Sequence, residues 1–187
     1  HTKQEDFLAV FEPLRSRLSG YIYALVRNRE EARDVMSDTI LLAYERFDGV
    51  RNRESFVFFL FTIARRLYHR SERRKKLFFV FSREETEMFS VHDHLPDMTA
   101  EIRLLYDALA QLPGRQREAI ALFDIAGLSL EEVRAVQGGT VSGVKTRLKR
   151  GRERLALLLG VRNDIHSQEQ RQQLTYTTNT TPETAGN

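Results

Sequence analysis

The sequence contains no cysteine among its 187 residues. This absence excludes a disulfide framework, a thiol nucleophile and a zinc site built on cysteine, and it fits a reducing cytoplasm. The chain also lacks any run of about 18 apolar residues, so we expect no insertion into a membrane. No positively charged segment followed by an apolar one, as in a secretion signal, opens the printed sequence.

Motifs for catalysis and metal binding are scarce as well. No glycine-rich loop is present to cradle a phosphate, and Gly138-Gly139 is typical of a simple turn. The histidines do not form the helical pair, four residues apart, that zinc enzymes use. The segment His92-Asp93-His94 offers an alternative metal site, but a solvated acidic linker explains it better. We therefore expect no enzyme, no cofactor and no metal.

Positive charge is concentrated in two blocks, although the net charge is only +3. One block runs from Arg65 to Lys76 and the other from Lys145 to Arg154. Two separated basic blocks on a nearly balanced chain predict two contacts with a polyanion such as nucleic acid. The competing interpretation is two solvated helix faces.

Apolar residues in the first half recur at steps of three and four, which predicts amphipathic helices rather than strands. The first stripe consists of Phe7, Phe11, Leu14, Leu18, Tyr21 and Leu25. Asn28 is a predicted cap for a second helix that ends at Asp48-Gly49, and Ser55 is a predicted cap for a third. We expect an all-α fold with a first helical domain over residues 1–76.

Residues 77–98 lack the helical periodicity of the preceding segments, and this predicts a linker. They begin with an apolar patch, Leu77 to Phe81, which we expect to pack on a domain or a partner, and continue with acidic residues. Because residues 82–98 hold too few apolar side chains for a core, we expect no large apolar seam between the domains and therefore a hinge. A second helical domain is predicted over residues 99–160, followed by a disordered tail over residues 161–187.

The second domain ends in a pattern typical of a helix-turn-helix. Ser129 and Glu132 can form a capping box, Gly138-Gly139 turns the chain, and Thr140 can cap the last helix. Burying Val144, Leu148, Gly151 and Leu155 leaves an opposite face with Ser142, Thr146 and Lys149, and flanks with Lys145, Arg147 and Arg150. Hydroxyl and lysine side chains suit base edges, and flanking basic side chains suit phosphates. An ordinary surface helix is the alternative.

Two stretches of the chain carry a family resemblance. Residues 112–155, LPGRQREAIALFDIAGLSLEEVRAVQGGTVSGVKTRLKRGRERL, resemble region 4 of the extracytoplasmic-function (ECF) sigma factors. The segments REEARDVMSDTILLAYERF and SFVFFLFTIARRLYHRSERRKK resemble region 2 of the same family. The chain departs from the family at Arg134, where a small residue is usual, and at Gln137, where an apolar one is usual. The long Arg134 side chain must therefore extend toward solvent or shift the packing.

The resemblance implies an alternative sigma factor that binds core RNA polymerase and recognises minus-ten and minus-thirty-five promoter elements. Upstream DNA contacts are then expected from Ser142, Lys145, Thr146, Arg147, Lys149 and Arg150. Downstream contacts and duplex opening are expected from Asp48, Val50, Arg51, Asn52, Arg53, Phe58, Phe61, Arg65, Arg66, Arg70, Arg73 and Arg74. For Phe58 and Phe61, burial in the linker interface is the competing interpretation.

The same resemblance implies protein partners. The clamp helices of the largest polymerase subunit are expected to contact Asp34, Ser37, Asp38 and Leu41, and the flap of the polymerase is a further expected contact. An anti-sigma factor is expected to mask exposed apolar features at Phe58, Phe61 and Leu77 to Phe81. Two alternatives stay open from the residues alone: a stand-alone helix-turn-helix regulator and a protein-interaction module.

Overall fold

The computed structural model describes residues 2–26, 28–49, 52–81 and 99–160, without the side chains of residues 49, 53, 54 and 78–81. Over these ranges the regular structure is helical, with seven α-helices and no strand. The predicted all-α fold is therefore confirmed. The predicted tail and residues 82–98 of the predicted linker lie outside the described residues.

Within the described ranges, no helix combines the length and the apolar character that crossing a membrane requires.

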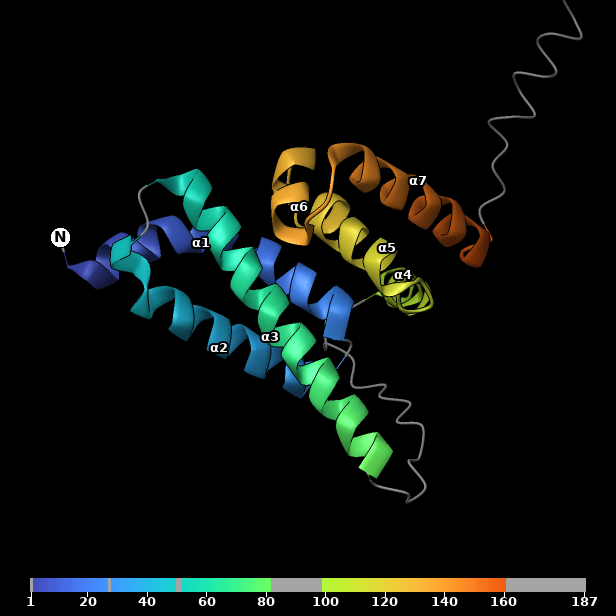
Figure 1. Ribbon diagram of the computed structural model, residues 1–187, viewed down its shortest axis with the longest axis horizontal. Coiled ribbons are helices and arrows are strands. Elements are labelled where there is room, and N and C mark those ends of the chain that lie inside the picture. Colours follow the sequence, from blue (N-terminus) through green and yellow to red (C-terminus); the bar gives the residue numbers. More distant parts are fainter. Residues whose placement is uncertain (1, 27, 50–51, 82–98, 161–187) are drawn as a thin grey trace, which may run out of the picture.

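The first half of the chain is a bundle of three helices, drawn in blue to green in Figure 1. These are α1 (Lys3–Val26), α2 (Arg29–Glu45) and α3 (Arg53–Phe81), with the short helix η1 (Phe47–Gly49) between α2 and α3. The predicted stripe of α1, from Phe7 to Leu25, is buried along its whole length. It packs against α2 and α3, which accounts for the amphipathic pattern of the sequence.

Side-chain caps fix where α2 and α3 begin. The Asn28 side chain accepts a hydrogen bond from the Glu31 backbone N–H at 3.0 Å, as predicted. At α3 the predicted cap is wrong: Asn52, not Ser55, accepts from a backbone N–H, that of Ser55 itself, at 2.7 Å. Both residue types are good caps, and the helix begins at the earlier one. α3 also continues to Phe81, five residues past the predicted domain boundary.

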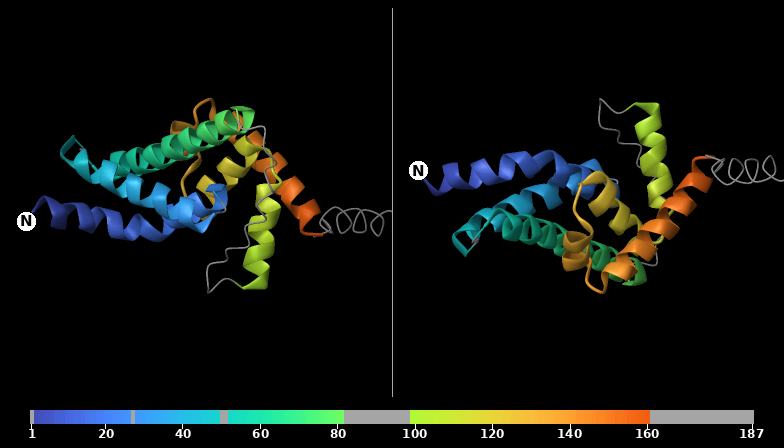
Figure 2. Two further views of the ribbon diagram at one scale, coloured as in Figure 1. Left: turned by 90° about the horizontal axis from the view of Figure 1, so that it is seen from below. Right: turned by 90° about the horizontal axis from the view of Figure 1, so that it is seen from above.

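The second half contains α4 (Ala100–Ala110), α5 (Gly114–Ile120), the π-helical turn η2 (Ala121–Ile125), α6 (Leu130–Gln137) and α7 (Val141–Leu158). Helices α5, α6 and α7 form the compact group at the upper right of Figure 1, and Figure 2 shows α4 projecting to one side. The predicted capping box is present: Glu132 N–H donates to Ser129 Oγ at 3.2 Å, and Ser129 N–H donates to Glu132 Oε2 at 2.7 Å.

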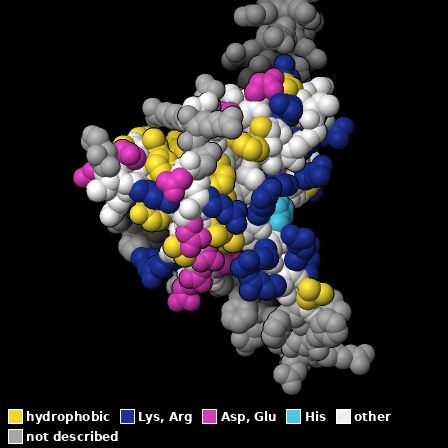
Figure 3. All heavy atoms as spheres, turned by 60° about the vertical axis from the view of Figure 1, so that its left-hand side comes forward, with side chains coloured by type: hydrophobic (Ala, Val, Ile, Leu, Met, Phe, Trp, Pro, Cys, Tyr) yellow, Lys and Arg dark blue, Asp and Glu magenta, His cyan; other side chains and the backbone are white. Residues whose placement is uncertain are grey.

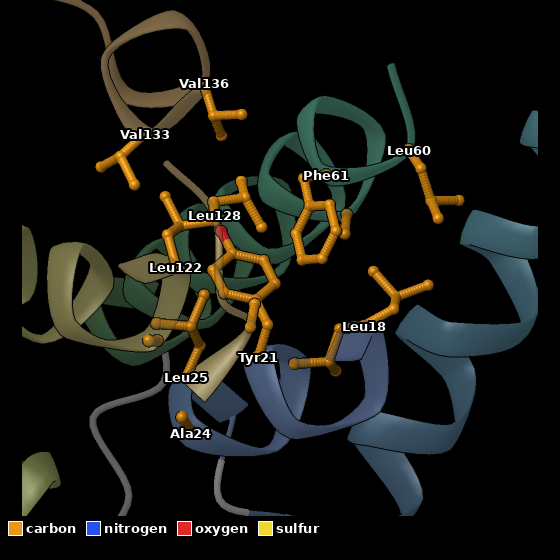
Figure 4. Close-up of a cluster of buried hydrophobic side chains, with 14 of the residues drawn as sticks. Leu18, Tyr21, Ala24, Leu25, Leu60, Phe61, Leu122, Leu128, Val133 and Val136 are labelled. Carbon is orange, nitrogen blue, oxygen red and sulfur yellow. The ribbon is translucent and has the colours of Figure 1, made fainter. Parts of the chain in front are cut away.

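The two halves share one apolar core, which Figure 4 shows in close-up. Leu18, Tyr21 and Leu25 of α1 and Phe61 of α3 meet side chains of η2, α6 and the segment between them. The partners from the second half are Leu122, Leu128, Val133 and Val136. We expected no large apolar seam between the domains, and this expectation is wrong. It rested on the composition of residues 82–98, whereas the seam is formed by apolar side chains of the helices in both halves.

Close backbone contact reinforces this seam. A Cβ on Gly20 of α1 would lie 2.9 Å from Ile125 Cγ2 of η2, so only glycine allows the observed approach. Nearby, Arg17 Nε donates to the Ala126 carbonyl at 2.5 Å, and its Nη2 donates to the Gly127 carbonyl at 3.1 Å. The end of η2 is thus tied to α1 by both packing and hydrogen bonds.

Candidate nucleic-acid interface

The helix-turn-helix consists of α6, a glycine turn and α7. Gly138 and Gly139 have φ values of 80° and 93°, in the left-handed region that favours glycine. Thr140 then caps α7, accepting a hydrogen bond from the Gly143 backbone N–H at 3.1 Å. These local features fix the direction in which α7 leaves the turn, and with it the face that α7 presents to solvent.

The outward face of α7 carries the expected contact residues. Val144, Leu148 and Gly151 are buried, as predicted, and Leu155 is half-buried. Exposed on the other side are Ser142, Lys145, Thr146, Lys149 and Arg150. The Lys149 side chain is 78% exposed, which leaves its ammonium group accessible to a polyanion. The chemistry of this face suits a groove of duplex DNA.

Arg147 differs from the other basic residues of α7 because it turns back onto the protein. Its Nε donates to Gln137 Oε1 at 3.1 Å, and its Nη2 donates to the Gly138 carbonyl at 3.3 Å. The guanidinium group thereby ties α7 to the end of α6 across the turn. The long side chain of Arg134 extends toward solvent, the first of the two predicted outcomes, and it pairs with Glu131 at 3.0 Å. It therefore does not disturb the crossing of the helices.

The second basic face lies on α3. Arg66, Arg70, Arg73 and Arg74 are exposed along this helix, and Phe58 is 40% exposed near its start. In Figure 3, Lys and Arg side chains form a band along one side of the visible face, and the largest group of acidic side chains lies outside this band. Such segregation favours approach of a polyanion from the basic side.

Two residues of the predicted α3 contact set lie elsewhere. Phe61 is fully buried and packs edge-on against Tyr21, with ring centroids 5.4 Å apart. Phe61 is therefore not accessible to DNA in this arrangement. The competing interpretation, burial in the linker interface, stays a prediction because residues 82–98 lie outside the described residues. Phe61 lies off the predicted stripe of α3, but it is buried in the apolar core that the two halves share, where it contacts Tyr21 of α1. Arg65 is half-buried and points toward the second half of the chain.

The predicted loop between α2 and α3 is described only in part. Asp48 forms an ion pair with Lys3 at 2.6 Å, and Asn52 serves as the cap of α3. Val50 and Arg51 lie outside the described residues, as does the side chain of Arg53. The structure thus gives two of these residues a local partner and leaves their contact with DNA a prediction.

The expected polymerase contacts lie together on one face of α2. Asp34, Ser37, Asp38 and Leu41 are all exposed, and the Leu41 side chain is 55% exposed. The first three residues line a groove between α2 and α3. Glu31 lines the same groove, but its carboxylate already has partners within the chain. It accepts hydrogen bonds from Ser71 Oγ at 2.6 Å and from Lys75 Nζ at 2.5 Å.

Sequence reasoning missed a polar cluster at the junction of the halves, centred on Glu118 of α5. Its side chain is 3% exposed, and Oε1 accepts a hydrogen bond from Arg65 Nε at 2.8 Å. His69 Nε2 lies 3.2 Å from the same oxygen, and Gln137 Nε2 donates to Oε2 at 2.7 Å. A signal was present: Glu118 begins an otherwise apolar run, and Gln137 stands where the family usually has an apolar residue.

A second polar contact crosses the junction beside this cluster. Arg117 Nη2 donates to the Tyr68 hydroxyl at 3.0 Å. Burial raises the pKa of Tyr68, so this hydroxyl stays protonated and neutral. Among the described residues, no group of histidine and acidic side chains is arranged to hold a metal ion, and the segment His92-Asp93-His94 lies outside them.

Comparison with known proteins identifies both halves. Residues 10–77 match the model of sigma-70 region 2, and residues 102–155 match the model of sigma-70 region 4. The ECF RNA polymerase sigma factor EcfG of Rhodopseudomonas palustris is 31% identical over 160 residues, which cover 84% of this chain and 85% of that protein. The RNA polymerase sigma factor CarQ of Myxococcus xanthus is 28% identical over 158 residues, covering 84% and 91%.

Comparison with solved structures leads to the same family and fold. The sigma factor RpoE of Bartonella quintana, determined with the anti-sigma factor NepR, superposes with a TM-score of 0.75 at 26% identity, over 85% of this chain and 99% of that one. CnrH, determined with the cytosolic domain of CnrY, has the same fold at a TM-score of 0.59 and 24% identity, over 86% and 91%. The match to region 2 gives no support to a stand-alone regulator. The chain belongs to the ECF sigma factors of the sigma-70 family, which are alternative factors for transcription initiation rather than classical enzymes.

Proposed function

We propose that this chain binds core RNA polymerase and directs it to promoters, reading the minus-thirty-five element with α7 and the minus-ten element with α3 and the loop before it. The observation that carries the proposal is the pair of exposed basic faces on α3 and α7, one in each family domain. The chain performs no chemistry of its own. We propose the bacterial cytoplasm as its place of action, because RNA polymerase works there.

The upstream element is read by the outward face of α7. Ser142, Lys145 and Thr146 follow the start of the helix, where a recognition helix contacts base edges in the major groove. Lys149 and Arg150 lie one turn further along and are placed to neutralise phosphates. Arg147 acts differently: by holding Gln137 and the Gly138 carbonyl, it sets the angle between α6 and α7.

The downstream element is opened at α3. Phe58 offers a half-exposed ring near the start of the helix, and an unstacked base gains about 1–3 kcal/mol by stacking on an aromatic side chain. The exposed arginines Arg66, Arg70, Arg73 and Arg74 follow the same helix and suit the backbone of the melted strand. Asp48, Asn52 and Arg53 adjoin this helix start, with Val50 and Arg51 between them in the sequence.

The protein partners bind other faces. Asp34, Ser37, Asp38 and Leu41 of α2 are proposed to contact the clamp helices of the polymerase, with the acids facing basic residues and Leu41 supplying apolar contact. The second half is proposed to contact the flap. Because the solved structure of RpoE from Bartonella quintana contains the anti-sigma factor NepR, we also propose an anti-sigma partner for this chain. It would cover exposed apolar side chains such as Phe58 and Leu77.

In-vitro transcription tests the proposal. Purified core polymerase, with and without the chain, is given a pool of genomic promoter fragments, and the transcripts are mapped. We expect a set of start sites that depends on the chain, shrinks when Lys145, Lys149 and Arg150 are together replaced by alanine, and persists with Arg15→Ala, an exposed arginine on α1. Absence of any chain-dependent transcript, together with no complex with core on gel filtration, would overturn the proposed function.

A further inference from the structure

The cluster around Glu118 joins the two proposed DNA-binding halves through their own basic residues. Arg65, from the basic block of α3, donates directly to the buried carboxylate. Arg147, from the basic block of α7, reaches the same carboxylate through Gln137. Arg65 and Arg147, both predicted to contact DNA, are therefore linked by hydrogen bonds through only two side chains, those of Glu118 and Gln137.

This arrangement conflicts with simultaneous promoter contact. Elements centred near minus ten and minus thirty-five lie about 25 base pairs apart, which is about 85 Å of duplex at about 3.4 Å per base pair. Two halves that share one apolar core cannot lie on both elements. The docked arrangement must open before the proposed function can proceed, and opening separates Arg65 from Glu118.

The chemistry of the cluster indicates what Glu118 does in the docked arrangement. A carboxylate that accepts from a guanidinium group resembles a phosphate oxygen in charge and in hydrogen bonding. The side chain of Glu118 is almost fully buried, so water screens this contact little. A buried carboxylate also needs its cationic partners, because an unpaired buried charge is strongly unfavourable.

We infer that Glu118 is an internal substitute for DNA phosphate: it holds Arg65 of the first half in a closed form that cannot span a promoter. Binding to polymerase separates the halves, Glu118 becomes solvated, and Arg65 becomes free for DNA. The closed form thus limits unspecific DNA binding by the free chain. This inference rests on the proposed function for its biological role, but the docking itself can be measured without polymerase.

The first test replaces Glu118 by glutamine in the full chain. Glu118→Gln keeps the size of the side chain and removes the charge that attracts Arg65. We expect a larger radius of gyration by small-angle scattering and about 5–30-fold tighter binding to a promoter fragment, the range that corresponds to one or two kcal/mol of lost docking. The matched control is Glu131→Gln, which changes the net charge equally at an exposed site on α6. Equal behaviour of the two variants in both measurements would contradict the inference.

The second test locks the closed form. The Cβ position of Gly20 lies 2.9 Å from Ile125 Cγ2. The Cγ2 atom lies about 1.5 Å from Ile125 Cβ, so the two Cβ atoms are at most about 4.4 Å apart, within the disulfide range of about 3.5–4.5 Å. Gly20→Cys with Ile125→Cys therefore places a disulfide across the seam. It also removes the Cγ2 atom that a side chain at position 20 would meet, and the natural chain has no cysteine to interfere.

We expect the oxidised double variant to lose promoter-directed transcription and the reduced form to regain it, while oxidant leaves the natural chain and each single variant active. Full activity of the oxidised, cross-linked form would overturn the inference and leave the proposed function intact. If the natural chain and the reduced variant both failed to support transcription, the proposed function would be at fault. The scattering comparison of Glu118→Gln with Glu131→Gln would then still decide whether Glu118 holds the halves together.

Discussion

The backbone of Gly151 in α7 lies so close to α5 that a Cβ at this position would sit 2.8 Å from Ile120 Cδ1. Gln116 Cβ lies on the same side, at 3.3 Å. The crossing of α5 and α7 therefore depends on the absence of a side chain, and it positions the outward face of α7.

Replacing this glycine should destabilise the chain. We expect Gly151→Ala to lower the free energy of unfolding by about 1–3 kcal/mol, because the added carbon overpacks the crossing. Urea denaturation of the full chain measures it. Gly114→Ala is the matched control, since a Cβ at Gly114 meets no described atom within 4 Å. There we expect no loss and a gain of up to about 1 kcal/mol. Equal effects at both sites would argue against the tight crossing.

A second prediction concerns the start of α6. Ser129→Ala removes the side chain that accepts the Glu132 backbone N–H and should cost about 1 kcal/mol of stability. Ser142→Ala, on the exposed face of α7, should change stability by less than about 0.5 kcal/mol. Thermal unfolding of the two variants side by side checks this difference. The capping box would have no energetic role if both melted like the parent.

The predictable parts of this molecule were those set by local chemistry. The buried stripe of α1, the capping box at Ser129 and the cap at Thr140 follow from spacing and residue type within a few positions of the chain. The outward face of α7 also followed, because burying Val144 and Leu148 fixes the opposite side of a helix. The family motifs then supplied the order of the two halves.

The parts that escaped prediction depend on contacts between distant residues. Arg17 and Ala126 meet across more than a hundred positions, and no local pattern encodes such a pairing. The burial of Phe61 depends on distant residues too, because its ring packs in the core to which both halves contribute. Glu118 was overlooked because an acidic residue in an arginine-rich helix resembles a surface residue until its neighbours are known.

The third prediction distinguishes the α7 residues that contact DNA from Arg147, which holds α7 against the end of α6. Lys149→Ala should weaken binding to any promoter and lower the salt dependence of log Kd by about one unit, because one phosphate contact is lost. Arg147→Ala should also lower stability, because its side chain holds Gln137 and the Gly138 carbonyl. Fluorescence anisotropy over a salt series and urea denaturation, with Arg15→Ala as control, measure both effects. An unchanged salt slope for Lys149→Ala would exclude that residue from the interface.

The fourth prediction concerns polymerase binding. Leu41→Ala truncates an exposed apolar side chain on α2, so stability should change by less than about 0.5 kcal/mol. If Leu41 lies at the centre of the contact, its loss should cost at least about 1 kcal/mol of binding, about fivefold in Kd. Titration of labelled core polymerase measures this affinity. Leu8→Ala, at a 38% exposed leucine on α1 outside the proposed contacts, is the control, and similar losses for both would contradict a specific role for α2.

The fifth prediction concerns alkaline pH. Burial raises the pKa of Tyr21 well above its usual value, and its hydroxyl has no hydrogen-bond partner among the described residues. The folded state thus favours the neutral phenol, so this contribution to stability is complete below the unfolded pKa of about 10 and is lost as pH rises above it. We expect Tyr21→Phe to be as stable as the parent or more so at pH 8, and to lose less stability between pH 9 and about 11. Urea denaturation across this range decides it, and parallel losses in both proteins would contradict the assignment.

The Glu118 cluster also has a consequence for sequence divergence. Three helices contribute to this cluster, and Arg65 belongs to region 2 whereas Glu118 and Gln137 belong to region 4. The Glu118 carboxylate accepts hydrogen bonds from the other two side chains. A change at one position removes a hydrogen bond from this buried cluster, so replacements at the three positions should tend to occur together in related chains. Recombining the first half of this chain with the second half of a distant relative should then yield a hybrid whose halves no longer recognise each other, even though each half retains its own fold.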